Sequence, residues 1–235
     1  ASFLFNLPCL VGATAIDISW LIEKVSLATW ETIYMVIIST VLAYLMGLPL
    51  GVILVITEKG HILENIPLNQ ILGFIVNVFR SIPFIIFLIL VIPLTKLLVG
   101  GFIGTVASMV PLTLAAVPFV ARLVETSLKE IEWGLIEAAL SMGANAWQII
   151  TKVLLPEASP SLILGVAITT INLVSYSAMA GIVGGGGLGT LAYYYGYQRY
   201  QTLVLLVTVV ILVVMVQGVQ LLGDTLAARV IKQRR

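Results

Sequence analysis

The chain has 235 residues, of which 60% are hydrophobic and 10% are charged, and its mean hydropathy is +1.13. A water-soluble domain carries charge on about a quarter of its residues, so this composition excludes a soluble enzyme. The net charge of +1 offers no basic field to a nucleic acid, and the single cysteine, Cys9, excludes a disulfide framework. The composition therefore predicts an all-α polytopic membrane protein embedded in a lipid bilayer.

Long gaps between charged residues leave five apolar stretches, each about long enough to cross a bilayer as a helix. In chain order the predicted spans cover about residues 33–56, 71–94, 102–120, 162–183 and 203–222. Arg80 and Pro83 interrupt the second stretch, so its membrane part is expected to start near Ile82. Arg80 is then expected at the interface, as an anchor whose long side chain reaches the headgroups.

The spans divide the chain into three parts. Residues 1–28 are expected to be an external or interfacial segment, residues 29–223 the transmembrane domain, and residues 224–235 a basic cytoplasmic tail. Within the first span, the Gly47-x-x-x-Gly51 pattern predicts close packing of this helix on another helix of the same chain. The glycine-rich run 184–189 is expected to form a turn that closes the fourth span, because it follows a membrane helix and not a strand.

Basic residues orient the predicted spans, since cytoplasmic loops of membrane proteins are enriched in Lys and Arg. Five spans place the two termini on opposite sides. With a cytoplasmic C-terminus, nine of the twelve basic residues lie inside: Lys59, Arg80, Arg122, Lys129, Lys152, Arg229, Lys232, Arg234 and Arg235. The remaining three, Lys24, Lys96 and Arg199, lie outside. The sequence therefore predicts an external N-terminus and a cytoplasmic C-terminus.

One long polar loop, about residues 121–161, separates the third and fourth spans and holds 8 of the 23 charged residues. Two short helical patterns flank Gly143, where a residue free to adopt positive φ would let the chain turn. Pro156 is expected to end the second pattern. The loop is read either as an amphipathic segment on the bilayer surface or as a docking element for a cytoplasmic partner. Balanced charge and small residues favour docking; the small residues are Ala138, Ala139, Gly143, Ala144 and Ala146.

The same loop carries a spaced motif. Glu137-Ala138-Ala139 is followed after three residues by Gly143, and after nine more by Val153-Leu154-Leu155-Pro156. This spacing resembles the EAA loop of ABC importer permeases, in which Ile stands where this chain has Val153. The resemblance implies the type I importer permease fold and an ATPase-coupling role for this loop. The residues that it assigns to coupling are Glu137, Ala138, Ala139, Gly143, Ala144, Leu155 and Pro156.

Further segments resemble the methionine-uptake permeases of that class, from about Trp30 to the C-terminus. They are Asn77 to Phe84, Val110 to Thr113, Val117 to Arg122, Tyr176 to Met179, Gly184 to Gly189 and Tyr195 to Tyr197. The resemblance implies a homodimer in the bacterial plasma membrane with two cytoplasmic ABC ATPase subunits and an extracellular substrate-binding protein. Residues 1–28 are not covered by it.

Motifs for chemistry are absent from the sequence. No Gly-x4-Gly-Lys-Ser/Thr run occurs, so no P-loop binds ATP, and ATP with its Mg²⁺ is expected on the partner ATPase. His61 is the single histidine, which argues against a metal site. No catalytic residue and no cofactor is therefore assigned, and the chain is not expected to be an enzyme itself.

The fourth predicted span is the richest in polar residues. Asn172, Ser175 and Met179 share a helix face, and Tyr176 lies within about one turn of them. Two readings stay open for this group: a translocation path for a neutral or zwitterionic amino acid, or ordinary helix packing through hydroxyl hydrogen bonds. For Met179 a hydrophobic gate is favoured, because a thioether is soft and apolar.

The sequence thus predicts the permease subunit of an ATP-driven importer, with methionine as the expected substrate and alternating access as the mechanism. One alternative is the same machine carrying another small amino acid or solute. Another, from a different class, is a channel or membrane scaffold subunit.

Overall fold

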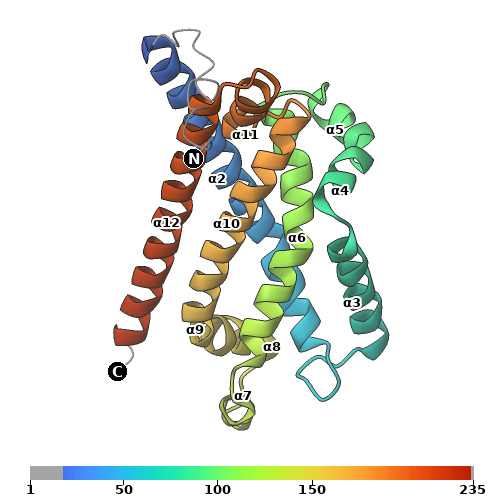
Figure 1. Ribbon diagram of the computed structural model, residues 1–235. Helices are drawn as coiled ribbons and strands as arrows, with labels where there is room; N and C mark the ends of the chain where they lie inside the picture. The colour runs from blue at the N-terminus through green and yellow to red at the C-terminus, as the bar shows by residue number, and fades with distance from the viewer. Residues whose placement is uncertain (1–17, 234–235) are drawn as a thin grey trace, which may run out of the picture. The chain divides into compact units, whose positions relative to one another are not determined.

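The computed structural model describes residues 18–233, and every regular element in that range is helical (Figure 1). The elements are α2 (Ile18–Ile56), α3 (Ile66–Ser81), α4 (Phe84–Leu90), α5 (Ile92–Val99), α6 (Thr105–Lys129), α7 (Trp133–Ser141), α8 (Ala146–Ile149), η1 (Ile150–Leu154), α9 (Leu155–Glu157), α10 (Ser159–Ile182), α11 (Gly187–Leu191), η2 (Ala192–Gln198) and α12 (Thr202–Gln233). The two η elements are π-helices. Most of the predicted N-terminal segment and the end of the basic tail, Arg234 and Arg235, lie outside the described residues.

Among residues 18–233, four helices are long and apolar enough to cross a membrane: α2, α6, α10 and α12. Helices α3 and α4 pass the same test as a pair but are bent by 105° at the break between them. The break falls at Ile82 and Pro83, where the ring of Pro83 holds Ile82 in extended backbone with φ −84° and ψ 123°. The interruption expected at Arg80 and Pro83 is confirmed. Counting the bent pair as one span gives five, as the sequence predicts.

Three helices continue beyond the limits that the charges suggested. Helix α2 begins at Ile18, inside the predicted N-terminal segment, and α12 runs to Gln233, through most of the predicted tail. Helix α6 runs to Lys129, so the first residues of the range expected to be loop, 121–161, are helical instead. None of the three extensions contains Pro and only that of α12 contains a Gly (Gly223), and Lys, Arg and Glu are good helix formers, so charge does not mark where a helix ends.

The chain divides into two compact units, each assembled from three separate stretches of sequence. Unit 1 comprises Ala1–Ser39, Phe84–Leu112 and Asn172–Gly218, and unit 2 comprises Thr40–Pro83, Thr113–Ile171 and Val219–Arg235. Helices α2, α6, α10 and α12 each contribute one segment to both units.

Unit 2 packs α2, α3 and α6 around Leu54, Val76 and Ala121, all buried. Gly47 and Gly51 lie on the α2 face in this contact. A Cβ atom on Gly51 would come within 2.6 Å of the carbonyl oxygen of Ala121, too close for any side chain. The Gly-x-x-x-Gly pattern thus serves packing within the chain, as predicted.

Unit 1 joins the start of α2 to α11 and α12 through a buried cluster that includes Ala28, Leu188 and Val204. Two side chains of α2 hold the start of α11. The Glu31 carboxylate accepts the backbone N–H of Gly187 at 2.7 Å, and the Thr32 hydroxyl accepts that of Leu188 at 2.9 Å. The turn after α10 has positive φ at Gly184, Gly186 and Gly187, so the glycine-rich run closes this helix as expected.

Candidate functional site

The segment with the EAA spacing folds in unit 2 as α7, a turn and α8 (Figure 1). Gly143 lies in the turn with φ +78°. Its N–H donates to the carbonyl oxygen of Leu140 at 2.9 Å, and the N–H of Ala144 donates to that of Ala139 at 3.0 Å. This pair of bonds is a Schellman ending, which requires the left-handed backbone that glycine adopts without strain. The predicted turn at Gly143 is confirmed.

Side chains fix the start of α8 as well. The Asn145 side chain accepts the N–H of Gln148, and the Gln148 side chain accepts the N–H of Asn145, both at 2.9 Å. This reciprocal capping box satisfies two backbone donors that the first turn of a helix would leave open. The turn between α7 and α8 therefore has a defined shape from both sides.

The predicted coupling residues lie at different depths. Glu137, Ala138, Gly143 and Pro156 are exposed, whereas Ala144 and Leu155 are half-buried. Ala139 is buried inside the unit, with 5% of its surface exposed, so it does not offer a surface to a partner.

Large apolar side chains provide much of the exposed surface here, a signal that the small-residue argument missed. They are Trp133, Leu135, Leu140, Met142 and Trp147. Met142 is 82% exposed and Trp147 is 71% exposed. Exposed apolar groups around a rigid turn indicate an interaction surface.

The expectation that Pro156 ends the second helical pattern is wrong. The chain stays helical from α8 through η1 and α9, and after a turn at Ala158 it enters α10. Pro156 is the second residue of the short helix α9, directly after the π-helix η1. The wider π-turn precedes it, with the N–H of Leu155 bonded to the carbonyl oxygen of Ile150.

The fourth span contributes to a groove in unit 1, with a cavity volume of about 540 Å³. Ser175 and Met179 line it from α10, together with Gln217 from α12 and apolar side chains of both helices. Tyr176 instead stacks on Phe84 with ring centroids 4.5 Å apart.

Asn172 is not among the residues that line this groove. The structure therefore brings two of the four predicted path residues, Ser175 and Met179, to one wall. It leaves Asn172 and Tyr176 elsewhere.

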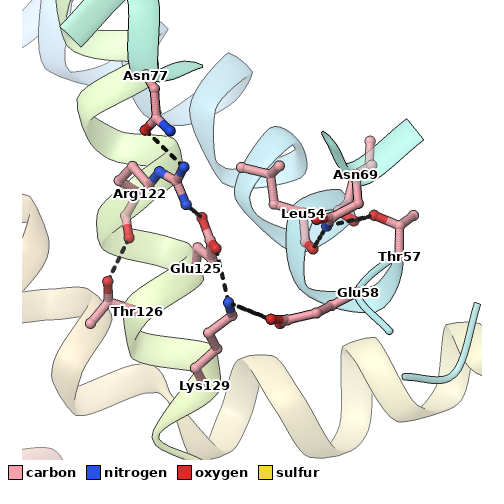
Figure 2. A network of polar contacts seen from close by, with 10 residues as sticks. Leu54, Thr57, Glu58, Asn69, Asn77, Arg122, Glu125, Thr126 and Lys129 are labelled. Atoms are coloured by element: carbon pink, nitrogen blue, oxygen red, sulfur yellow. Dashed lines mark hydrogen bonds and ion pairs between the residues drawn. The ribbon is translucent and has the colours of Figure 1, made fainter. Parts of the chain in front are cut away.

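A network of polar side chains in unit 2 joins α3, α6 and the α2–α3 loop (residues 57–65), as Figure 2 shows. Arg122, Glu125 and Lys129 occupy one face of α6 and pair with one another and with Asn77 and Glu58. In the sequence these three residues have helical spacing, which could have indicated a shared face. Their partners on other elements could not be found that way.

His61 of the same loop contacts the ring of Trp133 edge to face, with centroids 5.4 Å apart. Burial lowers the pKa of His61 below its ordinary value of 6.5, and the nearby charge of Lys129 adds to this while Glu58 opposes it. His61 is therefore neutral at pH 7. Among the residues that the structure describes, no group of three or more His, Cys, Asp or Glu could hold a metal ion.

Comparison with known proteins places the chain in a family. Residues 47–232 match the model of the binding-protein-dependent transport system inner membrane component. The chain belongs to this family. It is therefore an inner-membrane permease subunit of a bacterial transport system and not the ATPase.

Individual relatives in the family are similar over most of their length. A protein of Vibrio cholerae named probable D-methionine transport system permease protein MetI is 57% identical over 203 residues, covering 86% of this chain and 90% of that one. The protein of the same name in Haemophilus influenzae is 50% identical over 206 residues, covering 88% and 97%. A solved structure titled inward facing conformations of the MetNI methionine ABC transporter matches with a TM-score of 0.86 and 48% identity, over 90% of this chain and 96% of that chain.

Proposed function

We propose that this family member is the permease subunit of an ATP-driven methionine importer. The observation that carries the proposal is the combination of a rigid, exposed α7–turn–α8 segment with 57% identity to a relative named for D-methionine transport. Identity at this level over 86% of the chain supports shared substrate as well as shared fold.

The α7–turn–α8 segment is the proposed contact for a cytoplasmic ATPase. Glu137, Ala138 and Gly143 offer polar and small groups there, and Met142 and Trp147 offer apolar surface for burial. The solved relative is titled MetNI, which supports an ATP-binding partner that holds ATP and Mg²⁺. The complete importer has two copies of this chain, two ATPase subunits and an extracellular substrate-binding protein.

The membrane orientation follows from the charges. The N-terminus is proposed to lie outside and the C-terminus in the cytoplasm, because this arrangement puts nine of twelve basic residues inside. Residues 29–223 then form the transport domain, with a basic cytoplasmic end at residues 224–235. A reporter that is active only outside the cell should be silent when fused after Arg235.

Transport is proposed to proceed by alternating access. ATP binding brings the partner ATPases together, α7 and α8 move with them, and the permease shifts between two states that the nucleotide biases. Ser175 and Met179, exposed on the groove wall in unit 1, are the side chains proposed to meet substrate, with Met179 as gate. Asn172 and Tyr176 are proposed to support that face.

Met179→Ala tests the gate. Removing the thioether should raise basal ATP hydrolysis without raising methionine uptake, because the barrier that couples the two would be lost. Val174→Ala is the matched control, since Val174 lines the same groove but is buried. If ATP hydrolysis stays tightly coupled to methionine uptake in Met179→Ala, the residue serves helix packing and is not a gate.

The substrate is tested with the purified complex in lipid vesicles. We expect ATP hydrolysis to be stimulated by methionine together with its binding protein, and not by a panel of other amino acids. Stimulation by a different amino acid would support the role as an importer but contradict methionine as its substrate. Failure of any ATPase to co-purify would favour a channel or scaffold subunit and overturn the proposal.

A further inference from the structure

Five side chains from three elements of unit 2 form one continuous series of polar contacts (Figure 2). Arg122 donates through Nη2 to Oδ1 of Asn77 at 2.8 Å and through Nη1 to Oε2 of Glu125 at 2.6 Å. Lys129 reaches Oε1 of Glu125 at 3.1 Å and Oε2 of Glu58 at 2.9 Å. We call Asn77, Arg122, Glu125, Lys129 and Glu58 the polar strap.

Three of the five side chains share one face of α6, at spacings of three and four residues, so the helix presents them as a row. The Glu125 side chain is 10% exposed and accepts from a cation on each side. The strap contains two cations and two carboxylates, so it is neutral as a whole. If Glu125 lost one cation, this nearly buried carboxylate would depend on the other cation alone, which makes the row costly to open in parts.

The strap reaches two elements outside α6. Asn77 belongs to α3, and Glu58 belongs to the α2–α3 loop. Asn69 of α3 donates to the carbonyl oxygen of Leu54 in α2 and to the hydroxyl of Thr57. Side-chain bonds therefore tie the end of α2 to the start of α3, and they tie α3 and the loop between the two helices to α6.

The α2–α3 loop also reaches α7. His61 of this loop packs against Trp133, the first residue of α7. Lys129 is the last residue of α6, and only residues 130–132 connect it to Trp133 along the chain. The loop thus contacts the α6–α7 junction on both sides, once through an ion pair and once through a ring contact.

We propose that Lys129 is a positioning residue for coupling: its bond to Glu58 makes α7, α6 and the loop move together. The inference rests on the proposed function and specifies how a movement of α7 is transmitted to α6. With only residues 130–132 as a link, α7 could swing without α6. The α2–α3 loop resists that swing, because it holds α6 through the Lys129–Glu58 ion pair and α7 through the contact of His61 with Trp133. A hinge motion at residues 130–132 would have to break one of these two contacts.

The experiment uses the complete complex with its ATPase partners in lipid vesicles. ATP hydrolysed per methionine transported is measured alongside the melting temperature. Glu58→Gln and Lys129→Gln should each raise the ratio about fivefold or more, the lower end of usual coupling between sites. The double variant should be no worse than Lys129→Gln alone, since that single variant already removes the contact with Glu58 as well as the one with Glu125.

Two matched controls change charge in the same loop without touching α6. Glu64→Gln removes a carboxylate that accepts the N–H of Gly60 within the loop, and Lys59→Gln removes an exposed cation. Both should keep the ratio of the original complex. An equal rise in Glu64→Gln would mean that loop charge, and not the bond to Lys129, is responsible.

A covalent rescue separates holding from folding. Glu58→Cys with Lys129→Cys, in a Cys9→Ser background, should be uncoupled until a short bis-maleimide joins the two thiols, and coupled afterwards. No rescue, an unchanged ratio in the Gln variants, or a complex that assembles only after cross-linking would each overturn the inference. If the original complex shows no methionine-stimulated hydrolysis, the proposed function itself fails and the inference falls with it.

Discussion

Gly143 has a backbone conformation, at φ +78°, that L-residues adopt only with strain. Within the described chain no heavy atom lies within 4 Å of a Cβ added there, so strain and not crowding sets the cost, about 1–2 kcal/mol. We expect Gly143→Val to lose ATPase coupling and Gly143→Asn to retain it, because Asn tolerates the left-handed region. Equal loss in both variants, measured by methionine-stimulated hydrolysis, would show that the partner needs the space itself.

His61 makes stability depend on pH, because burial lowers the pKa of its imidazole. Well above pH 6.5 the ring is neutral in folded and unfolded chains alike. As pH falls below 6.5, the unfolded chain binds the proton first, so the free energy of unfolding decreases. His61→Gln should reduce the fall in melting temperature as the pH drops below 6.5. An unchanged slope in that variant would assign the acid sensitivity to other groups.

At the scale of elements, the contact between α2 and α6 depends on two glycines. A methyl group on Gly51 would meet the Ala121 carbonyl oxygen and Val124 Cβ, both at 2.6 Å. Gly51→Ala should therefore lower stability by about 1–3 kcal/mol through overpacking. Gly218→Ala in α12 is the control, because among the described residues nothing lies within 4 Å of its added Cβ. Melting curves in one detergent compare them, and equal shifts would contradict close packing at Gly51.

Sequence reasoning located elements well where the signal is local. Apolar runs located the long helices, and a lone glycine between two helical patterns located the turn at Gly143. Helix ends were missed because charges were used as boundaries, although α6 needs no charge-free stretch to continue to Lys129. The continuation of the helix through Pro156 was missed because a π-helical turn before a proline has no simple sequence pattern.

Contacts between residues that are far apart in the chain could not be predicted from the sequence. Glu58 and Lys129 lie 71 positions apart, and nothing local relates them. Ser175 and Met179 share a face by spacing alone, whereas the stacking of Tyr176 on Phe84 depends on how the elements of unit 1 pack. Helical periodicity fixes which residues of one helix are neighbours and not which helix they meet.

At the scale of the whole molecule, each unit draws on three stretches of sequence, and the last stretch of each includes part of α12. The buried cluster of unit 1 includes Val204, so a chain ending at Gln201 lacks part of that core. We expect this truncated chain to be degraded rapidly by added protease, whereas a chain ending at Val230 should resist. Equal resistance of the two products on a gel would contradict the need for α12.

Helix α12 has 32 residues, and 11% of its most apolar stretch is buried. At 1.5 Å per residue it is about 48 Å long, well beyond the roughly 30 Å of hydrocarbon in a bilayer. A helix that outruns the hydrocarbon must tilt or extend into the headgroups. Few side chains of α12 pack against the rest of the chain, so its tilt is expected to follow the hydrophobic thickness of the host membrane. The length of the lipid tails then sets the tilt of this helix.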